Sequence, residues 1–114
     1  MASTRSTGSN FILHLGVGSF HRAHQAWYLH RLTAAATPGE PHWSLTVGNI
    51  RGDMNATLDA LARQKGVYTL ETVTPQGERA YETIRSIERV LPWSPTLAPL
   101  VEAGADPACK IISF

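Results

Sequence analysis

Residues 11–26 decide the fold of this chain and read Phe-Ile-Leu-His-Leu-Gly-Val-Gly-Ser-Phe-His-Arg-Ala-His-Gln-Ala. A short apolar run meets Gly16 and Gly18, and a helical pattern begins directly behind them. Glycine lets the backbone turn sharply and approach a ligand without a Cβ in the way. The free N–H groups and the positive dipole end at the start of a helix favour an anion. The stretch therefore predicts a strand, a tight turn and a helix that together bind a phosphate group.

Basic side chains occupy the first turn of the expected helix. His21 and Arg22 place positive charge at the positive end of the helix dipole, which is unfavourable unless an anion binds there. In the alternative interpretation, Arg22 points to solvent or pairs with an acid elsewhere. Ser19 lacks the Gly-x-Ser-x-Gly context of a nucleophile and is interpreted as a loop hydroxyl that can bond a phosphate. The dinucleotide-binding fingerprint has a small residue where this chain has His21, so the spacing matches only in part.

Apolar runs and turn residues predict a βαβ unit in the first half of the chain. Strands are expected over residues 11–15 and 43–50, and the second is apolar on both faces in its middle, as in a parallel sheet. The helix between them is expected over residues 20–35, because two prolines and a glycine follow it. Its residues close to one face include Phe20, Ala23, Trp27 and Leu32.

A second helix is expected over residues 54–64, with Gly66 as its C-cap. Its buried stripe is expected to consist of Leu58, Leu61 and Ala62. The pattern then alternates, which predicts strands over residues 67–73 and 80–90 joined by a turn at residues 75–78. The second strand can bend or break beyond residue 84.

The last part of the chain is expected to form a short helix over residues 95–103 and the start of another buried strand at residue 110. The resulting fold class is α/β: a partial Rossmann-type, doubly wound parallel sheet with an inserted β-hairpin, formed by residues 11–114. Residues 1–10 are expected to be a flexible terminus. Since the chain stops inside an apolar run, we expect it to be the N-terminal part of a longer protein.

The composition excludes several classes of partner. The chain has 114 residues and a net charge of +1, which does not suggest a nucleic acid or another polyanion. No stretch approaches the roughly 20 apolar residues of a membrane span, so no membrane partner is expected. The single cysteine, Cys109, excludes an intrachain disulfide and suits the cytoplasm. We expect it to be a small buried residue.

Three polar residues follow the second expected strand, where dinucleotide folds bind the adenosine ribose. Asn49 stands at the strand end, and Arg51 and Asp53 come next. Asp53 would favour NAD by repelling a 2′-phosphate, whereas Arg51 would welcome that phosphate. Asp53 can equally be the N-cap of the helix that follows. The pattern favours NAD.

The other chemistry-bearing residues have simpler interpretations. His21, His24 and His30 share one helical stretch, but no glutamate or cysteine stands at a companion spacing, so no metal site is expected. His24 and His30 are interpreted as packed or exposed helix residues. Trp27 and Trp93 are interpreted as packing residues.

The sequence Leu-Gly-Val-Gly-Ser-Phe-His-Arg-Ala-His-Gln-Ala-Trp-Tyr-Leu, at residues 15–29, resembles the N-terminal signature of the polyol-specific long-chain dehydrogenases, the mannitol dehydrogenase family. That family has a large residue where other Rossmann enzymes have a third glycine, so His21 fits it. Arg51, the Gln-Lys-Gly-Val-Tyr-Thr-Leu run at residues 64–70 and the final Ile-Ile-Ser also match. The resemblance extends from about residue 11 to the end of the chain.

Within the family, the chain looks most like members that oxidise D-arabinitol, partly because it has Val-Gly-Asn-Ile-Arg at residues 47–51. The resemblance implies a reversible, NAD-dependent oxidation of a polyol, D-arabinitol, to D-xylulose, without a metal. It also implies a lysine base in a C-terminal helical domain that is absent from these residues. The chain alone is therefore expected to be inactive, and no catalytic residue is assigned within it.

The resemblance assigns cofactor contacts by position. The pyrophosphate would be held by Gly16, Gly18, Ser19, Phe20 and Arg22, and the adenosine ribose would be met by Asn49, Arg51 or Asp53. The family has an acidic pair after Arg51, where this chain has Asp53 and then Met54. Three alternatives remain: a mannitol 2-dehydrogenase, a fructuronate or tagaturonate reductase of the same family, and a nucleotide-binding module without catalysis.

Overall fold

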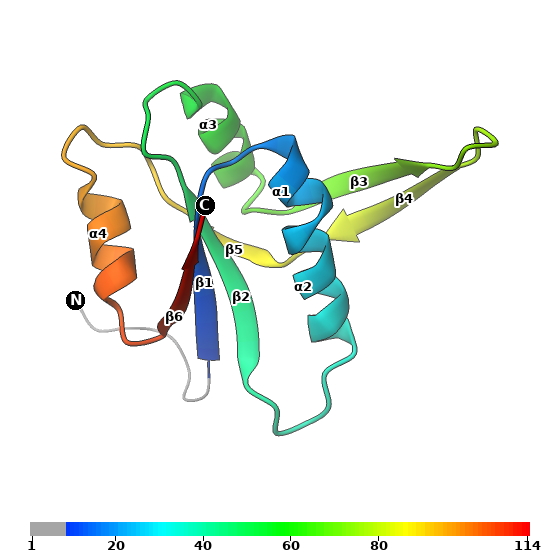
Figure 1. Ribbon diagram of the computed structural model, residues 1–114, viewed down its shortest axis with the longest axis horizontal. Coiled ribbons are helices and arrows are strands. Elements are labelled where there is room, and N and C mark those ends of the chain that lie inside the picture. The colour runs from blue at the N-terminus through cyan, green and yellow to red at the C-terminus, as the bar shows by residue number, and fades with distance from the viewer. Residues whose placement is uncertain (1–8) are drawn as a thin grey trace.

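The strand, glycine turn and helix of residues 11–26 form the first crossover of a four-stranded parallel sheet (Figure 1). The computed structural model describes residues 9–114. The strand order is β5-β2-β1-β6, and every neighbouring pair is parallel. The strands are β1 (Ser9–Leu15), β2 (His42–Gly48), β5 (Ile87–Val90) and β6 (Cys109–Ser113). The Rossmann-type α/β fold is therefore confirmed.

Helices cover both faces of this sheet, and each face has its own apolar core. The helices are α1 (Ser19–Ala23), α2 (Gln25–Ala34), α3 (Asn55–Arg63) and α4 (Ala98–Ala105). Ile12 of β1 packs in the core that contains residues of α2 and α3, whereas Phe11 and Leu13 pack with Leu100 of α4. This alternation follows from the period of two along a strand. Figure 1 shows α4 on the opposite side of the sheet from α1 and α2.

The helix expected over residues 20–35 is two helices, because the backbone breaks at His24 (φ −120°, ψ −82°). The break changes which side chains are buried. Phe20 is 77% exposed and Leu32 60% exposed, while His21 is buried with Ala26 and Leu29. The expected apolar face was wrong because the helical period does not run through the break.

The expected ends of α3 agree with the structure within one residue, and Leu58 and Leu61 are buried as predicted. Ala62 is exposed, because it lies beyond the buried stripe. Gly66 is the glycine of the C-terminal cap, with φ +78° and its N–H bonded to the Leu61 carbonyl at 2.8 Å. A Cβ at this position would lie 2.1 Å from the Ile87 carbonyl oxygen, so only glycine fits.

The predicted hairpin exists as β3 (Tyr68–Val73) and β4 (Arg79–Ile84), an antiparallel pair separate from the main sheet. Its turn end projects away from the body (Figure 1). The second expected strand breaks at residues 85–86, and β5 then joins the parallel sheet. Ser86 stabilises this break, because its hydroxyl donates to the Ala26 carbonyl at 2.6 Å and its carbonyl accepts from the Leu45 N–H at 2.8 Å.

The end of the chain differs from expectation in three ways: the start of its helix, the exposure of its last strand, and the partial exposure of Cys109, which was expected to be buried. Helix α4 begins at Ala98, not residue 95, after Leu97 in a left-handed conformation (φ 59°), and Pro99 lies in its first turn. Ile111 and Ile112 are 47% and 53% exposed, so β6 is not a buried strand. In the described chain β6 pairs only with β1 and is an outer strand of the sheet. Cys109 is a free, half-buried thiol.

The flexible terminus expected over residues 1–10 is too long, because Ser9 and Asn10 begin β1. The rest of that segment lies outside the described residues. Among residues 9–114, no helix is long and apolar enough to cross a membrane.

Candidate functional site

The glycine turn lies at the carboxyl ends of β1 and β2. The Gly16 N–H donates to the Gly48 carbonyl at 2.7 Å, which fastens the start of the turn to the end of β2. Gly16 has φ +152°, and a Cβ there would lie 3.3 Å from Nε2 of His14. Close packing also favours glycine at Gly48, since a Cβ there would lie 2.5 Å from Leu100 Cδ2 and 3.3 Å from Leu91 Cβ. One backbone hydrogen bond and the neighbouring side chains therefore fix the start of the turn within the chain itself.

The far side of the turn is open. Gly18 has an ordinary extended conformation (φ −71°, ψ 162°), and a Cβ built on it meets no atom within 4 Å. Helix α1 begins at the next residue, Ser19, and its first intrahelical acceptor is the Gly18 carbonyl, which receives the Arg22 N–H. The N–H groups before Arg22 have no helical acceptor. Ser19 and Phe20 are exposed beside them.

Arg22 links the turn to the hairpin. Its Nε lies 3.5 Å from the Gly18 carbonyl oxygen, a long hydrogen bond, and its own carbonyl accepts from the Tyr68 hydroxyl. Burial raises the pKa of Tyr68 to about 12, so this phenol remains a donor. Arg22 also lines a pocket of about 290 Å³ with Gln64 and Tyr68. The guanidinium thus lies between the glycine turn and α3.

His21 does not have the role that the sequence suggested. Its side chain is 7% exposed, and burial lowers its pKa to about 4, with the charges on His14 and Arg22 acting in the same direction. His21 is therefore neutral at neutral pH and adds no positive charge to the turn. The nearby Gln25 amide opposes part of this shift, although neither ring nitrogen has a hydrogen bond of normal geometry among the described residues.

A polar cluster that sequence reasoning missed lies under the turn. The rings of His14 and His21 stack at 3.7 Å between centroids, with planes 3° apart. His14 Nδ1 lies 2.8 Å from the Ser113 hydroxyl, which in turn lies 3.4 Å from Gln25 Oε1. Burial also lowers the pKa of His14. The one signal of this cluster in the sequence is a histidine, His14, inside an apolar strand.

The three polar residues after β2 come together in the structure. The Asn49 amide donates to the Arg51 carbonyl at 2.8 Å and to Asp53 Oδ1 at 3.1 Å. Asp53 is not the N-cap of α3, because that position is Met54 and no side chain caps the helix. Arg51 and Asp53 are both exposed. The loop thus presents one carboxylate and one guanidinium beside the glycine turn.

The remaining histidines do not form a cluster with ligand geometry. His24 is exposed at the helix break, whereas His30 lies on α2 with its Nε2 3.6 Å from Glu82 Oε2. In the described part of the chain, no three histidine, cysteine or carboxylate side chains are grouped to hold a metal ion.

The fold and the site define a class of protein. A parallel sheet carries a glycine turn at the carboxyl end of β1 and a polar loop at the end of β2. Strands β2 and β6 pair with β1 on its two opposite sides, so the glycine turn lies at the point where the strand order reverses. Open α/β sheets bind nucleotides at this point. This architecture is that of a Rossmann-type domain.

Comparison with known proteins gives the family. Residues 10–113 match the family model described as the mannitol dehydrogenase Rossmann domain. The chain therefore belongs to the mannitol dehydrogenase family.

Two relatives are D-arabinitol 4-dehydrogenases. The protein from Ralstonia nicotianae is 76% identical over 103 residues, and that from Klebsiella pneumoniae is 56% identical over 102 residues. Each alignment covers 90% of this chain and 22% of the relative, so the chain spans about a fifth of their length. Among solved structures, the Pseudomonas fluorescens mannitol 2-dehydrogenase in a ternary complex with NAD and D-mannitol is similar, with a TM-score of 0.78 and 26% identity. That match covers 94% of this chain and 24% of the other.

Proposed function

We propose that this chain is the NAD-binding part of a dehydrogenase that oxidises D-arabinitol to D-xylulose reversibly. The observation that carries the proposal is the open glycine turn at the strand-order reversal of a mannitol dehydrogenase family chain. The 76% and 56% identity to two D-arabinitol 4-dehydrogenases supports the choice of polyol. The cytoplasm is the proposed compartment, because a chain with a single cysteine has no intrachain disulfide that would need an oxidising environment.

The residues at the turn fit a pyrophosphate. Gly18 leaves free space where a side chain would stand, and the exposed start of α1 offers backbone donors at Ser19 and Phe20. Arg22 supplies the positive charge that His21, being neutral, does not. Bound NAD would supply the hydride acceptor, while this chain binds and orients it.

The loop after β2 favours NAD over NADP. A carboxylate accepts hydrogen bonds from ribose hydroxyls and repels a 2′-phosphate. Asn49 orients the Asp53 carboxylate, whereas no hydrogen bond is described for the exposed guanidinium of Arg51. We therefore assign the ribose contact to Asp53, with Asn49 as its support.

Replacing Asp53 tests this assignment. In the complete protein, Asp53→Ala should lower kcat/KM for NAD by about ten-fold, the value expected for hydrogen bonds to a charged group, and raise it for NADP. The matched control is Asp59→Ala, which removes an exposed carboxylate on α3 and should leave both values unchanged. An unchanged preference in Asp53→Ala would contradict the ribose assignment.

The proton acceptor of the reaction is assigned to the part of the protein beyond this chain. Oxidation of the polyol moves a hydride from the substrate carbon to the nicotinamide and the hydroxyl proton to a base. Lys65 lies two residues beyond the end of α3, Lys110 lies on the outer strand β6, and both are exposed. We assign no catalytic role to either.

Initial rates on the complete protein test the whole proposal. NAD and NADP should each be offered with D-arabinitol and with D-mannitol. We expect the highest kcat/KM with D-arabinitol and NAD. A mannitol preference would identify a mannitol 2-dehydrogenase, an alternative for which the solved mannitol enzyme is the specific support. NAD binding without activity on either polyol, or on fructuronate or tagaturonate, would indicate a nucleotide-binding module.

A further inference from the structure

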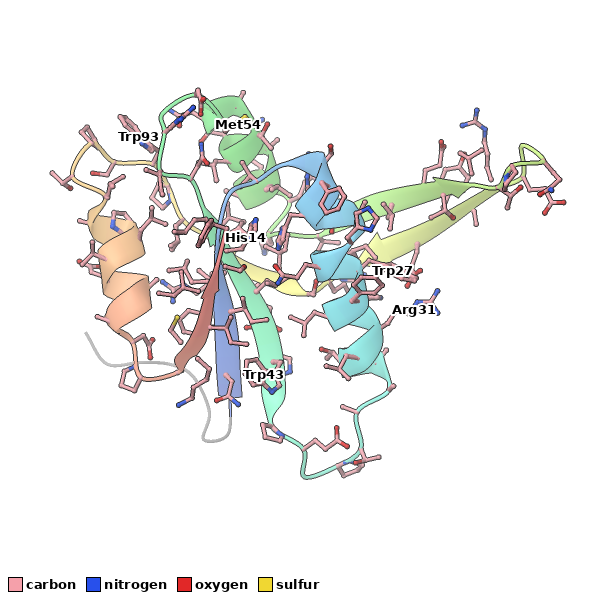
Figure 2. All side chains as sticks on the ribbon, in the orientation of Figure 1. His14, Trp27, Arg31, Trp43, Met54 and Trp93 are labelled. Carbon is pink, nitrogen blue, oxygen red and sulfur yellow. The ribbon has the colours of Figure 1, made fainter. Side chains whose placement is uncertain are left out.

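Trp93 joins the loop after β5 to the loop after β2. Its indole Nε1 donates to the Ile50 carbonyl at 2.9 Å, across 43 positions of sequence. The acceptor belongs to residues 49–53, the loop that carries Asn49, Arg51 and Asp53 and is here called the ribose loop. Figure 2 shows Trp93 beside this loop, at the same end of the molecule as Met54, the residue before α3.

The ring of Trp93 also packs against the ribose loop. A Cβ built on Gly52 would lie 3.1 to 3.2 Å from three carbons of the six-membered indole ring. Gly52 does not have a positive φ, so the backbone itself accepts any residue. The close approach of the ring therefore favours glycine at this position. One side chain thus makes a polar and a packing contact with adjacent parts of the loop.

The rest of the ribose loop is exposed. Ile50 is 51% exposed, and Arg51, Gly52 and Asp53 are exposed as well. Within the loop, the Asn49 amide joins the Arg51 carbonyl to the Asp53 carboxylate. These bonds fix the loop residues relative to one another. The hydrogen bond from Trp93 instead fixes the ribose loop to the loop after β5. An exposed loop without such a bond samples many conformations.

We propose that Trp93 is a positioning residue that sets the preference for NAD over NADP by holding the Asp53 carboxylate at the adenosine ribose. The proposal rests on the proposed function. Two ribose hydroxyls need a carboxylate at a fixed place, and the repulsion of a 2′-phosphate depends on the same placement. Releasing the loop weakens the contacts to NAD, and it gives Arg51 freedom to approach the phosphate of NADP.

Trp93→Phe in the complete protein tests this role. Phenylalanine retains an aromatic ring at this position but lacks the N–H that reaches the Ile50 carbonyl. We expect the ratio of kcat/KM for NAD to that for NADP to fall about five-fold, as for the loss of one hydrogen bond, with kcat at saturating NAD unchanged. A general loss of folded protein would lower both cofactor activities equally and leave the ratio unchanged.

Gly52→Ala provides a second variant with the indole intact. The added methyl group must displace the Trp93 ring, so the ratio should fall in the same direction. Trp43→Phe is the matched control, because Trp43 lies at the other end of the sheet, far from the ribose loop (Figure 2). It should leave the ratio at the wild-type value. If Trp93→Phe is insoluble, Gly52→Ala decides the test.

The outcomes separate this proposal from the one on which it rests. A wild-type protein that binds neither NAD nor NADP in equilibrium dialysis would overturn the proposed function and this inference with it. A wild-type protein that uses NAD, with a ratio unchanged in Trp93→Phe and Gly52→Ala, would overturn the inference alone. An equal fall in Trp43→Phe would also overturn it.

Discussion

Gly16 and Gly18 stand two positions apart, and the structure favours glycine only at the first of them. Gly16 is confined by the chain itself, because its φ is +152° and His14 lies against it. Gly18 is confined by nothing in the described chain. This open space agrees with the proposal that Gly18 leaves room for the pyrophosphate. The pattern of two glycines predicted the turn but not this difference, which depends on the backbone conformation at Gly16 and on where the His14 ring lies.

Gly18→Ala in the complete protein should consequently affect ligand binding more than folding. We expect the Kd for NAD to rise about ten-fold, the cost of crowding a close contact, while the loss of the N-cap glycine costs less than about 1 kcal/mol of stability. Isothermal titration with NAD and a denaturation curve measure the two effects. Gly104→Ala is the control, since its Cβ makes only ordinary contacts, at 3.7 Å or more, and should leave NAD affinity unchanged. Unchanged affinity in Gly18→Ala would contradict the placement of the pyrophosphate.

The buried His21 predicts a pH dependence of stability. Its pKa is about 4 in the folded chain and about 6.5 when unfolded, so unfolding takes up a proton between these values. The contribution of neutral His21 to the free energy of unfolding is complete above pH 6.5. It is lost as the pH falls towards 4, by at most about 1.4 kcal/mol per pH unit.

His21→Phe removes this titration while keeping a ring against His14. The difference in free energy of unfolding between pH 7.5 and pH 5, measured by urea denaturation of the complete protein, should be smaller in the variant than in the wild type. His24→Phe, at an exposed position of the same segment, is the control and should retain the wild-type pH dependence. An equal loss of stability with falling pH in His21→Phe would show that His21 is not buried as a neutral group.

At the scale of elements, one carboxylate joins the projecting hairpin to α2. Glu82 of β4 accepts from Trp27 Nε1 at 3.0 Å and from Arg31 Nε and Nη2 at 3.2 and 3.1 Å. These hydrogen bonds, that of Trp27 first, lower the pKa of Glu82. Figure 2 shows Trp27 and Arg31 on the side of α2 that faces the hairpin. An isolated two-stranded ribbon is marginally stable in water, so such contacts with the body matter.

Glu82→Gln should therefore loosen the hairpin. Hydrogen exchange of the β3 and β4 amides, followed by mass spectrometry, should become several-fold faster, while exchange in β1 and β2 stays unchanged. Glu71→Gln is the control, because the described partners of Glu71, Arg79 and Tyr81, lie along the exposed ribbon itself, and exposed pairs contribute little. Equal exchange in the two variants would contradict the anchoring role of Glu82.

Local sequence predicted the order of elements and missed the details that tertiary packing decides. The glycine turn and the alternating hairpin were predictable because each signal lies within a few neighbouring residues. The break at His24 was not, because the helical pattern of the sequence continues through it. The same holds for Trp93, whose acceptor is 43 residues away, and for His14, whose partner Ser113 lies on another strand.

For the whole molecule, the resemblance predicts that cofactor binding and proton transfer belong to different parts of the complete protein. The 114 residues contain the glycine turn and the ribose loop, and they span about a fifth of the length of the D-arabinitol 4-dehydrogenases they match. The lysine base that the resemblance implies has no counterpart here. Binding without a base orients the nicotinamide but leaves the polyol proton in place.

We therefore expect the isolated 114 residues to produce no NADH from D-arabinitol and NAD, while the complete protein at equal concentration does. NADH absorbance measures the reaction, and circular dichroism establishes that the isolated chain is folded in the assay. Adding the separately expressed remainder of the protein should restore turnover if the two parts associate, because it supplies the base to a cofactor already oriented by the glycine turn. Turnover by the folded 114 residues alone would place a base within this chain and contradict the division of roles.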